Sequence, residues 1–154
     1  MPSQEFIFRV KLPVGTAWSF MNNRTEVGRL FPGCKDIMLL NELDSLWTVS
    51  FSLGPFSRTL VMKGHTTEQI ENKRIAWIVT HELFTVTGVT LLREISKRET
   101  EITYRLDAKA NRSLQFLQNF IIGEKVHETV EIFVNSIKER LALLAEKARK
   151  GIAS

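Results

Sequence analysis

The feature that most constrains the fold is a run of apolar residues with helical spacing near the end of the chain. Within residues 112–148 these residues recur at steps of three or four positions, with charged side chains between them. A continuous helix over this span would be about 55 Å long, and its one apolar face could not be stable alone in water. It therefore requires a large apolar surface to cover. The face consists of Val126, Val130, Phe133, Ile137, Leu141, Leu144 and Ala148.

The first part of this predicted helix contains a glycine, Gly123, near which the apolar stripe shifts by about one position. Glycine inside a helix costs about 1 kcal/mol relative to alanine, so it requires a reason. One interpretation is close packing of the helix against a strand. The other is a bend that leaves space beneath the helix.

The preceding hundred residues show the alternation that is typical of half-buried strands. Residues 4–12, for example, place Phe6, Phe8 and Val10 on one face, and Pro13 ends the pattern. Further strands are predicted at 36–41, 46–53, 57–68, 74–82, 85–96 and 101–108, with short helices at 14–21 and 25–30. Short connections favour antiparallel neighbours. This order predicts an α+β fold in which a long C-terminal helix covers an antiparallel sheet of about seven strands.

The composition is that of an ordinary globular domain. The chain has 154 residues, of which 44% are hydrophobic and 25% are charged, so one domain over residues 1–154 is expected. No apolar run is long enough for a transmembrane helix, and the start lacks the pattern of a signal peptide. The one cysteine, Cys34, excludes an internal disulfide, and a cytoplasmic location is the simplest expectation.

Residues suited to metal binding are scattered. His65, His81 and His127 do not have the spacing of metal ligands on one element, and Cys34 has no cysteine partner. No functional metal and no other cofactor is therefore expected.

Residues suited to catalysis are equally dispersed. Cys34 would need a nearby base, for which His65 or His81 are candidates, and the alternative is a structural cysteine beside a turn. Glu82 and Glu94 could enter a cavity mouth, so an enzyme using one of them remains open.

Short motifs, mostly structural glycines and prolines, run through the whole chain. They are Pro13 with Trp18 and Phe20, Pro32-Gly33, Leu53-Gly54-Pro55, Gly64, Gly88 and the strand Thr100-Glu101-Ile102-Thr103-Tyr104. With these motifs the chain resembles the START-like superfamily, also called SRPBCC, and within it the carbon monoxide dehydrogenase CoxG family. Cys34 follows the Pro-Gly pair rather than preceding it, and this departure weakens any role carried over to the cysteine.

The resemblance implies a helix-grip fold like that of START and Bet v 1 proteins, with a deep apolar cavity between a curved sheet and the long helix. The superfamily uses this cavity for lipids, sterols, quinones and other hydrophobic molecules, and sometimes for cyclase or hydrolase chemistry. The CoxG family is associated with membrane recruitment of a molybdenum hydroxylase and with quinone handling. A non-enzymatic protein that binds a lipid- or quinone-like molecule is therefore the leading expectation.

The candidate ligand-binding residues are mainly apolar and aromatic side chains that alternation places on one strand face or at the start of the long helix. Ordinary core packing could explain each of them, but together they could line a pocket for a flat or long apolar ligand. Tyr104 would supply a hydroxyl. A register error of one residue would invert the face. The set is Trp47, Phe51, Met62, Trp77, Tyr104, Phe116, Phe120 and Gly123.

Three functions thus remain open: a carrier of an apolar small molecule, a cyclase- or hydrolase-type enzyme, and a protein that recruits an oxidoreductase to the membrane. The basic end at Lys147, Arg149 and Lys150 predicts weak peripheral contact with the inner membrane face, although cations are also favoured at any helix C-terminus. Nucleic acid is not an expected partner, because no basic stripe is interleaved with exposed aromatic residues.

Overall fold

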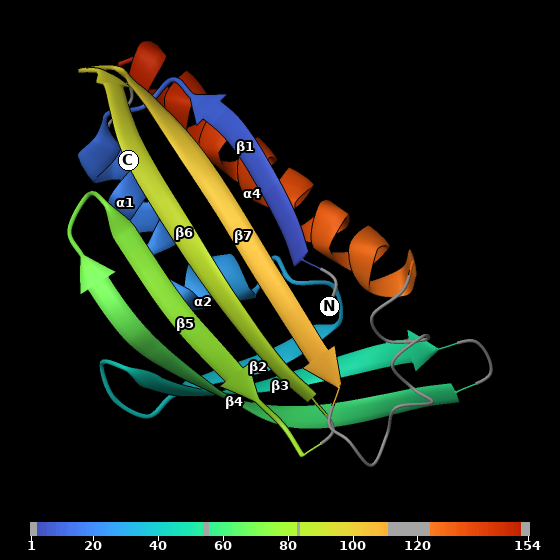
Figure 1. Ribbon diagram of the computed structural model, residues 1–154. Coiled ribbons are helices and arrows are strands. Elements are labelled where there is room, and N and C mark those ends of the chain that lie inside the picture. Colours follow the sequence, from blue (N-terminus) through green and yellow to red (C-terminus); the bar gives the residue numbers. More distant parts are fainter. Residues whose placement is uncertain (1–2, 54–55, 83, 111–123, 152–154) are drawn as a thin grey trace.

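The structure is a computed structural model that describes residues 3–53, 56–82, 84–110 and 124–151. In this part of the chain, seven strands form one curved sheet, with helices against its inner face (Figure 1). The predicted α+β helix-grip fold is confirmed. The elements are β1 (Ser3–Val10), α1 (Val14–Met21), α2 (Arg24–Gly28), β2 (Cys34–Leu39), β3 (Asp44–Leu53), β4 (Phe56–Ile70), β5 (Arg74–Thr80), β6 (Phe84–Ser96), β7 (Glu99–Ala110) and α4 (Glu124–Arg149).

The strand order in the sheet is β1-β7-β6-β5-β4-β3-β2, and every neighbouring pair is antiparallel. Strands β2 to β7 therefore follow one another as a meander. The first strand is instead carried to the far edge by α1 and α2, and it pairs with the last strand. This closure places residues from the two ends of the chain side by side on the inner face.

Some predicted boundaries were wrong by about two residues. Strand β1 ends at Val10 rather than at residue 12, but Leu12 is still buried, and its carbonyl accepts a hydrogen bond from Thr100 Oγ1 at 2.8 Å. Strand β3 begins at Asp44 rather than at residue 46. The turn before it is therefore shorter than predicted, because Asn41 Oδ1 accepts hydrogen bonds from the amides of Leu43 and Asp44, both at 2.8 Å.

The two short helices form as predicted, one residue offset at the second. Pro13 precedes α1, which buries Ala17, Phe20 and Met21. Helix α2 begins at Arg24, since the side chain of Asn23 accepts a hydrogen bond from the Glu26 amide at 3.0 Å and caps the helix.

Helix α4 follows the predicted apolar face over most of its length. Val130, Phe133, Ile137 and Leu141 are buried and Leu144 is partly buried. The prediction was wrong for Ala148, which is exposed together with the whole last turn, residues 146–150. The predicted helix over 112–123, with the bend at Gly123, lies outside the described residues, and so does the side chain of Val126.

Two clusters of apolar side chains make up the described core. The first cluster lies between α4, α1 and the sheet, and it consists of Val10, Leu12, Ala17, Phe20, Met21, Ile75, Leu92, Ile102, Tyr104, Leu106, Val130, Phe133, Val134, Ile137 and Leu141. The second cluster consists of Val49, Leu60, Met62 and Phe84 on β3, β4 and β6, with Trp47, Val79, Val86 and Phe31 packed against it. Within the described residues, no member of the second cluster comes from α4. No described helix is both long and apolar enough to cross a bilayer.

Candidate functional site

The structure places four of the predicted ligand-binding residues on the inner face of the sheet. Trp77 and Tyr104 belong to the surroundings of the first cluster, whereas Trp47 and Met62 belong to the second cluster. Phe31 and Val86 contact both clusters, so the two groups are continuous. The inner face therefore carries one apolar surface that runs from α4 to β3.

The other predicted residues cannot be placed in the same way. Phe51 lies in β3 opposite Arg58, but its side chain is not among those described. Phe116, Phe120 and Gly123 lie outside the described residues. The predicted arrangement of Phe116 and Phe120 across an unfilled space from the sheet therefore stays a prediction.

A chain of aromatic rings connects the sheet to α4. The rings of Trp77 and Tyr104 have centroids 6.5 Å apart and are tilted by 41°. Tyr104 meets Phe133 of α4 edge to face at 5.9 Å, and Phe133 meets Phe31 in the same manner at 5.3 Å. Edge-to-face pairs at these distances are favourable beyond the area they bury. They hold the inner face at a defined distance from the helix.

Trp77 lies directly on the neighbouring strand because Gly88 leaves room for it. The two residues are paired across β5 and β6, and a Cβ atom added at Gly88 would lie 2.0 Å from the Trp77 ring. Any side chain at this position would force the indole to move. Gly88 therefore sets the position of Trp77 on the inner face.

Trp47 is held between α2 and β4. Cβ atoms added at Gly28 and Gly64 would come within 2.8 Å and 3.2 Å of its ring, and its Nε1 donates a hydrogen bond to Ser45 Oγ at 2.8 Å. These contacts use part of the indole to pack α2 onto the sheet. Trp47 thus has a structural role in addition to any part in binding.

Two polar side chains on the inner face have no hydrogen-bond partner among the residues that the structure describes. Gln4 Oε1 is buried and accepts no hydrogen bond. Tyr104 is only 3% exposed, burial raises the pKa of its hydroxyl, and no hydrogen bond joins that hydroxyl to another described residue. Buried polar groups are normally paired, and leaving one unpaired costs free energy.

The register of β1 and β7 brings these two residues together. Gln4 pairs with Leu106 and Phe6 pairs with Tyr104, so Gln4 and Tyr104 are diagonal neighbours on the same face. Gln4 was missed in the sequence analysis. The available signal was its position, since it precedes Phe6, Phe8 and Val10 in the same alternating pattern.

The remaining buried polar side chains in the described part of the chain are hydroxyls. They belong to Ser45, Thr66, Thr90 and Thr100. Glu82 and Glu94 are both exposed. The carboxylates that the sequence analysis considered for an enzyme are thus not buried beside the clusters.

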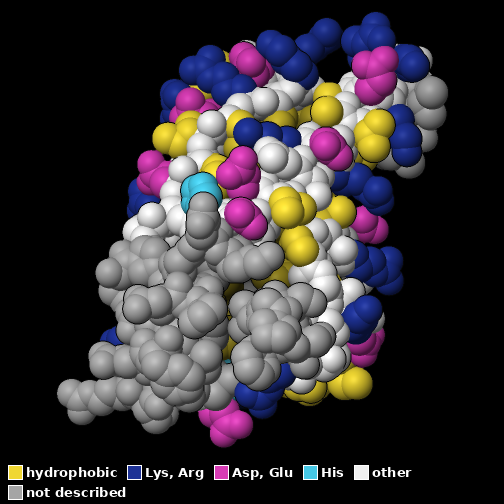
Figure 2. Space-filling view, turned by 90° about the vertical axis from the view of Figure 1, so that its right-hand side faces the viewer, with side chains coloured by type: hydrophobic (Ala, Val, Ile, Leu, Met, Phe, Trp, Pro, Cys, Tyr) yellow, Lys and Arg dark blue, Asp and Glu magenta, His cyan; other side chains and the backbone are white. Residues whose placement is uncertain are grey.

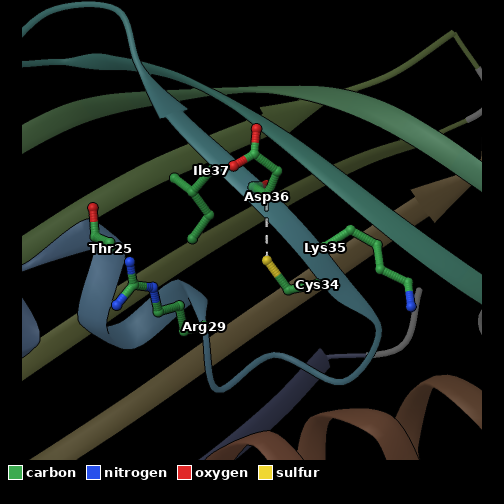
Figure 3. A pocket seen from close by; sticks show the side chains of 6 residues that line it. All are labelled: Thr25, Arg29, Cys34, Lys35, Asp36 and Ile37. Atoms are coloured by element: carbon green, nitrogen blue, oxygen red, sulfur yellow. Dashed lines mark hydrogen bonds between the residues drawn. The ribbon is translucent and has the colours of Figure 1, made fainter.

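Cys34 lines a pocket of about 160 Å³ between α2 and β2, with Thr25, Arg29, Lys35, Asp36 and Ile37 (Figure 3). Burial raises the pKa of its thiol, and Sγ lies 3.9 Å from the Asp36 carbonyl oxygen. A raised pKa keeps the thiol protonated, and a protonated thiol is a poor nucleophile. This environment supports the structural interpretation of Cys34.

The three histidines lie apart from one another in contact with other groups. His65 Nδ1 is 2.7 Å from Asp44 Oδ1, His127 Nε2 is 3.4 Å from Glu131 Oε2, and His81 stacks on Phe84. Among the residues that the structure describes, no group of three His, Cys, Asp or Glu side chains is arranged to hold a metal ion.

The surface charge is mixed. Figure 2 shows acidic and basic side chains interspersed on the face that it presents. At the C-terminal end of α4, Glu146 contacts Arg149 at 2.6 Å and Lys150 at 3.5 Å. Part of the basic charge predicted to contact a membrane is therefore balanced within the helix.

Solved structures with the same fold share little sequence with this chain. A conserved protein from Geobacillus kaustophilus has a TM-score of 0.75 at 16% identity, with 92% of this chain and 95% of that chain covered. A START superfamily protein from Mycobacterium smegmatis has a TM-score of 0.70 at 13% identity, with 92% and 98% covered. The Zhui aromatase/cyclase from Streptomyces sp. R1128 has a TM-score of 0.66 at 11% identity, with 95% and 94% covered. At these identities the likeness shows the fold alone.

The sequence comparison is more specific. No curated protein matches the chain significantly. The family model of the carbon monoxide dehydrogenase protein CoxG matches residues 7–142, which include most of β1, the two short helices, the whole meander and most of α4. With its START-like fold, the chain belongs to the carbon monoxide dehydrogenase CoxG family.

Proposed function

We propose that this protein binds a hydrophobic small molecule of the lipid or quinone class in the interior between the sheet and α4. The family and the fold are those of proteins suited to hydrophobic ligands. The continuous apolar inner face, with the Trp77, Tyr104 and Phe133 rings at its centre, supports the proposal. Ligand pockets are commonly lined in this way, with a few polar groups that orient the ligand.

The observation that carries the proposal is the pair of polar groups, Gln4 and Tyr104, on this apolar face. Tyr104 can donate a hydrogen bond through its hydroxyl, and Gln4 can both donate and accept through its amide. A ligand carbonyl or hydroxyl placed between them would satisfy groups that are otherwise buried without described partners. The ligand we propose therefore has an apolar body and at least one polar oxygen.

We further propose that the bound molecule serves an oxidoreductase of carbon monoxide dehydrogenase type, with this protein as an accessory factor. The support is family membership alone. A binding measurement with the purified oxidoreductase, with and without the loaded ligand, tests this part separately.

The first experiment is mass spectrometry of organic-solvent extracts from protein purified without detergent. A stoichiometric apolar compound that carries an oxygen function is the expected result. Stripped protein should then be titrated with a short-chain quinone and with palmitic acid, with melting temperature and tryptophan fluorescence as readouts. Binding stabilises the folded state by mass action, so a productive ligand raises the melting temperature.

A matched pair of variants locates the site. Tyr104→Phe removes a buried hydroxyl from the inner face, and Thr103→Val removes the hydroxyl of the neighbouring residue, which points to the other face. Tyr104→Phe should weaken binding of an oxygen-bearing ligand by about threefold to tenfold, the worth of one hydrogen bond. Thr103→Val should bind like the wild type. Absence of any extracted compound, together with no response to either probe, would contradict the proposal.

A further inference from the structure

The turn between β2 and β3 exposes a concentration of large apolar side chains. Met38, Leu39, Leu40 and Leu43 are between 41% and 54% exposed, and we call these four residues the apolar turn. The turn lies at the edge strand of the sheet, on the side of the molecule away from α4 (Figure 1). Contiguous exposed apolar residues usually mark a contact surface.

The backbone of this turn is satisfied from within the protein. The amides of Leu40 and Asn41 donate to the Asp44 carbonyl at 2.9 and 3.3 Å, and those of Leu43 and Asp44 donate to Asn41 Oδ1, both at 2.8 Å. The Leu43 carbonyl accepts from the Thr66 amide at 2.8 Å. The apolar side chains are thus displayed by a turn whose polar groups are largely paired.

A side chain from α2 completes this pairing. The guanidinium of Arg24 donates to the carbonyl of Asp44 at 3.0 Å and to that of Asn41 at 2.8 Å. The Asp44 carboxylate is held by His65 and by the Asn41 amide, and the His65 contact lowers the pKa of that carboxyl. The carboxylate is therefore tied to the turn rather than projecting from it.

From this turn we infer that the protein docks on the interface of a lipid bilayer. A loop can enter a lipid environment only if its backbone polar groups are bonded within the protein, and this turn meets that requirement at seven of its amides and carbonyls. A protein partner or a second copy could instead bond to unpaired groups, so the internal pairing favours lipid. This inference stands apart from the proposed ligand site.

The surrounding charges limit the depth of insertion. Lys63 lies on the same face as Met38, joined to it across β3 by Leu46, and it is exposed to lipid headgroups. Glu42 is also exposed and lies between Leu40 and Leu43 in the chain. The turn therefore reaches the interface, with the leucines toward the acyl chains and the Glu42 carboxylate among the headgroups.

Two double variants test the inference. Leu40→Ser with Leu43→Ser removes apolar area from the turn. Ile132→Ser with Leu143→Ser removes a comparable area from the outer side of α4, where the two residues are 56% and 57% exposed. Neither pair contributes to the described core, so both variants should keep the wild-type circular dichroism and a cooperative melt. Co-sedimentation with vesicles of phosphatidylcholine containing a minority of phosphatidylglycerol measures docking.

The turn variant should lose about tenfold or more in vesicle affinity, and the α4 variant should bind like the wild type. Glu42→Gln should bind these vesicles more tightly, because one repulsive charge is removed. Equal loss in both double variants, or unchanged binding by the turn variant, would overturn the inference. It would also be overturned if the wild type were a dimer that the turn variant converts to a monomer, since the surface would then join two copies. Quinone or palmitic acid binding in lipid-free buffer should be the same in both double variants, so failure of docking and failure of the proposed ligand site are distinguished.

Discussion

The ring of Tyr104 on β7 meets the ring of Phe133 on α4 edge to face, with centroids 5.9 Å apart and planes at 78°. Phe133 meets Phe31 in the same geometry at 5.3 Å. One side chain of the helix thus contacts the last strand and the segment that follows α2. Phe133 is therefore the point at which α4 is tied to two distant parts of the chain.

Replacing Phe133 with alanine should lower the free energy of unfolding by about 3–5 kcal/mol, because a buried ring is removed and its partners cannot fill the space. Urea unfolding measures the change. Ile132→Ala is the control, since Ile132 precedes it on α4 and is 56% exposed. The control should stay within about 0.5 kcal/mol of the wild type. Similar losses in the two variants would show that α4 does not pack as described.

Gly88→Ala should destabilise the protein by about 1–3 kcal/mol or more, because the new Cβ would lie 2.0 Å from the Trp77 ring. Displacement of the indole should also shift the tryptophan emission. Gly15→Ala provides a contrast, as its Cβ would have nothing nearer than Asn72 Oδ1 at 3.9 Å. Because Gly15 lies in α1, this change should be neutral or stabilising by up to about 1 kcal/mol. A neutral Gly88→Ala would contradict the position of Trp77.

Tyr104 should remain protonated at pH values where an exposed tyrosine ionises. Burial raises its pKa above the ordinary value of 10.0, and it is the only tyrosine in the chain, so ultraviolet absorbance of the phenolate reports on it alone. Its contribution to stability is fully present below the unfolded-state pKa. As the pH rises above that value, the unfolded state loses its proton first, and stability should fall by up to about 1.4 kcal/mol per pH unit. Phenolate absorbance should therefore appear together with unfolding. A reversible titration near pH 10 in the folded protein would contradict the burial of this hydroxyl.

Arg24→Ala should loosen the β2–β3 turn, because the carbonyls of Asn41 and Asp44 lose their shared donor. We expect a loss of about 1–2 kcal/mol in stability and faster hydrogen exchange at the amides of Leu43 and Asp44. Arg29→Ala, an exposed arginine at the end of the same helix, should leave both measurements near the wild-type values. Unchanged exchange in Arg24→Ala would mean that Asn41 alone holds the turn.

The sequence by itself determined the class of fold. Strand alternation such as Phe6, Phe8 and Val10, and helical spacing such as Val130, Phe133 and Ile137, are local patterns, so they can be read without knowing what each segment contacts. The order of the segments then left an antiparallel sheet under a long helix as the simplest arrangement. The pattern did not distinguish Ala148, whose small side chain lies in a fully exposed last turn.

Only the tertiary structure decided which residues meet. Gln4 and Tyr104 become neighbours because β1 pairs with β7, at opposite ends of the chain, and no local pattern encodes that register. Trp47 is enclosed by Gly28 and Gly64, and the turn at Leu40 and Leu43 is fixed by Arg24 from another element. Each of these contacts depends on side chains brought together by the closure of the sheet. The periodicity of a segment specifies which face is buried, but the pairing of segments decides what that face contacts.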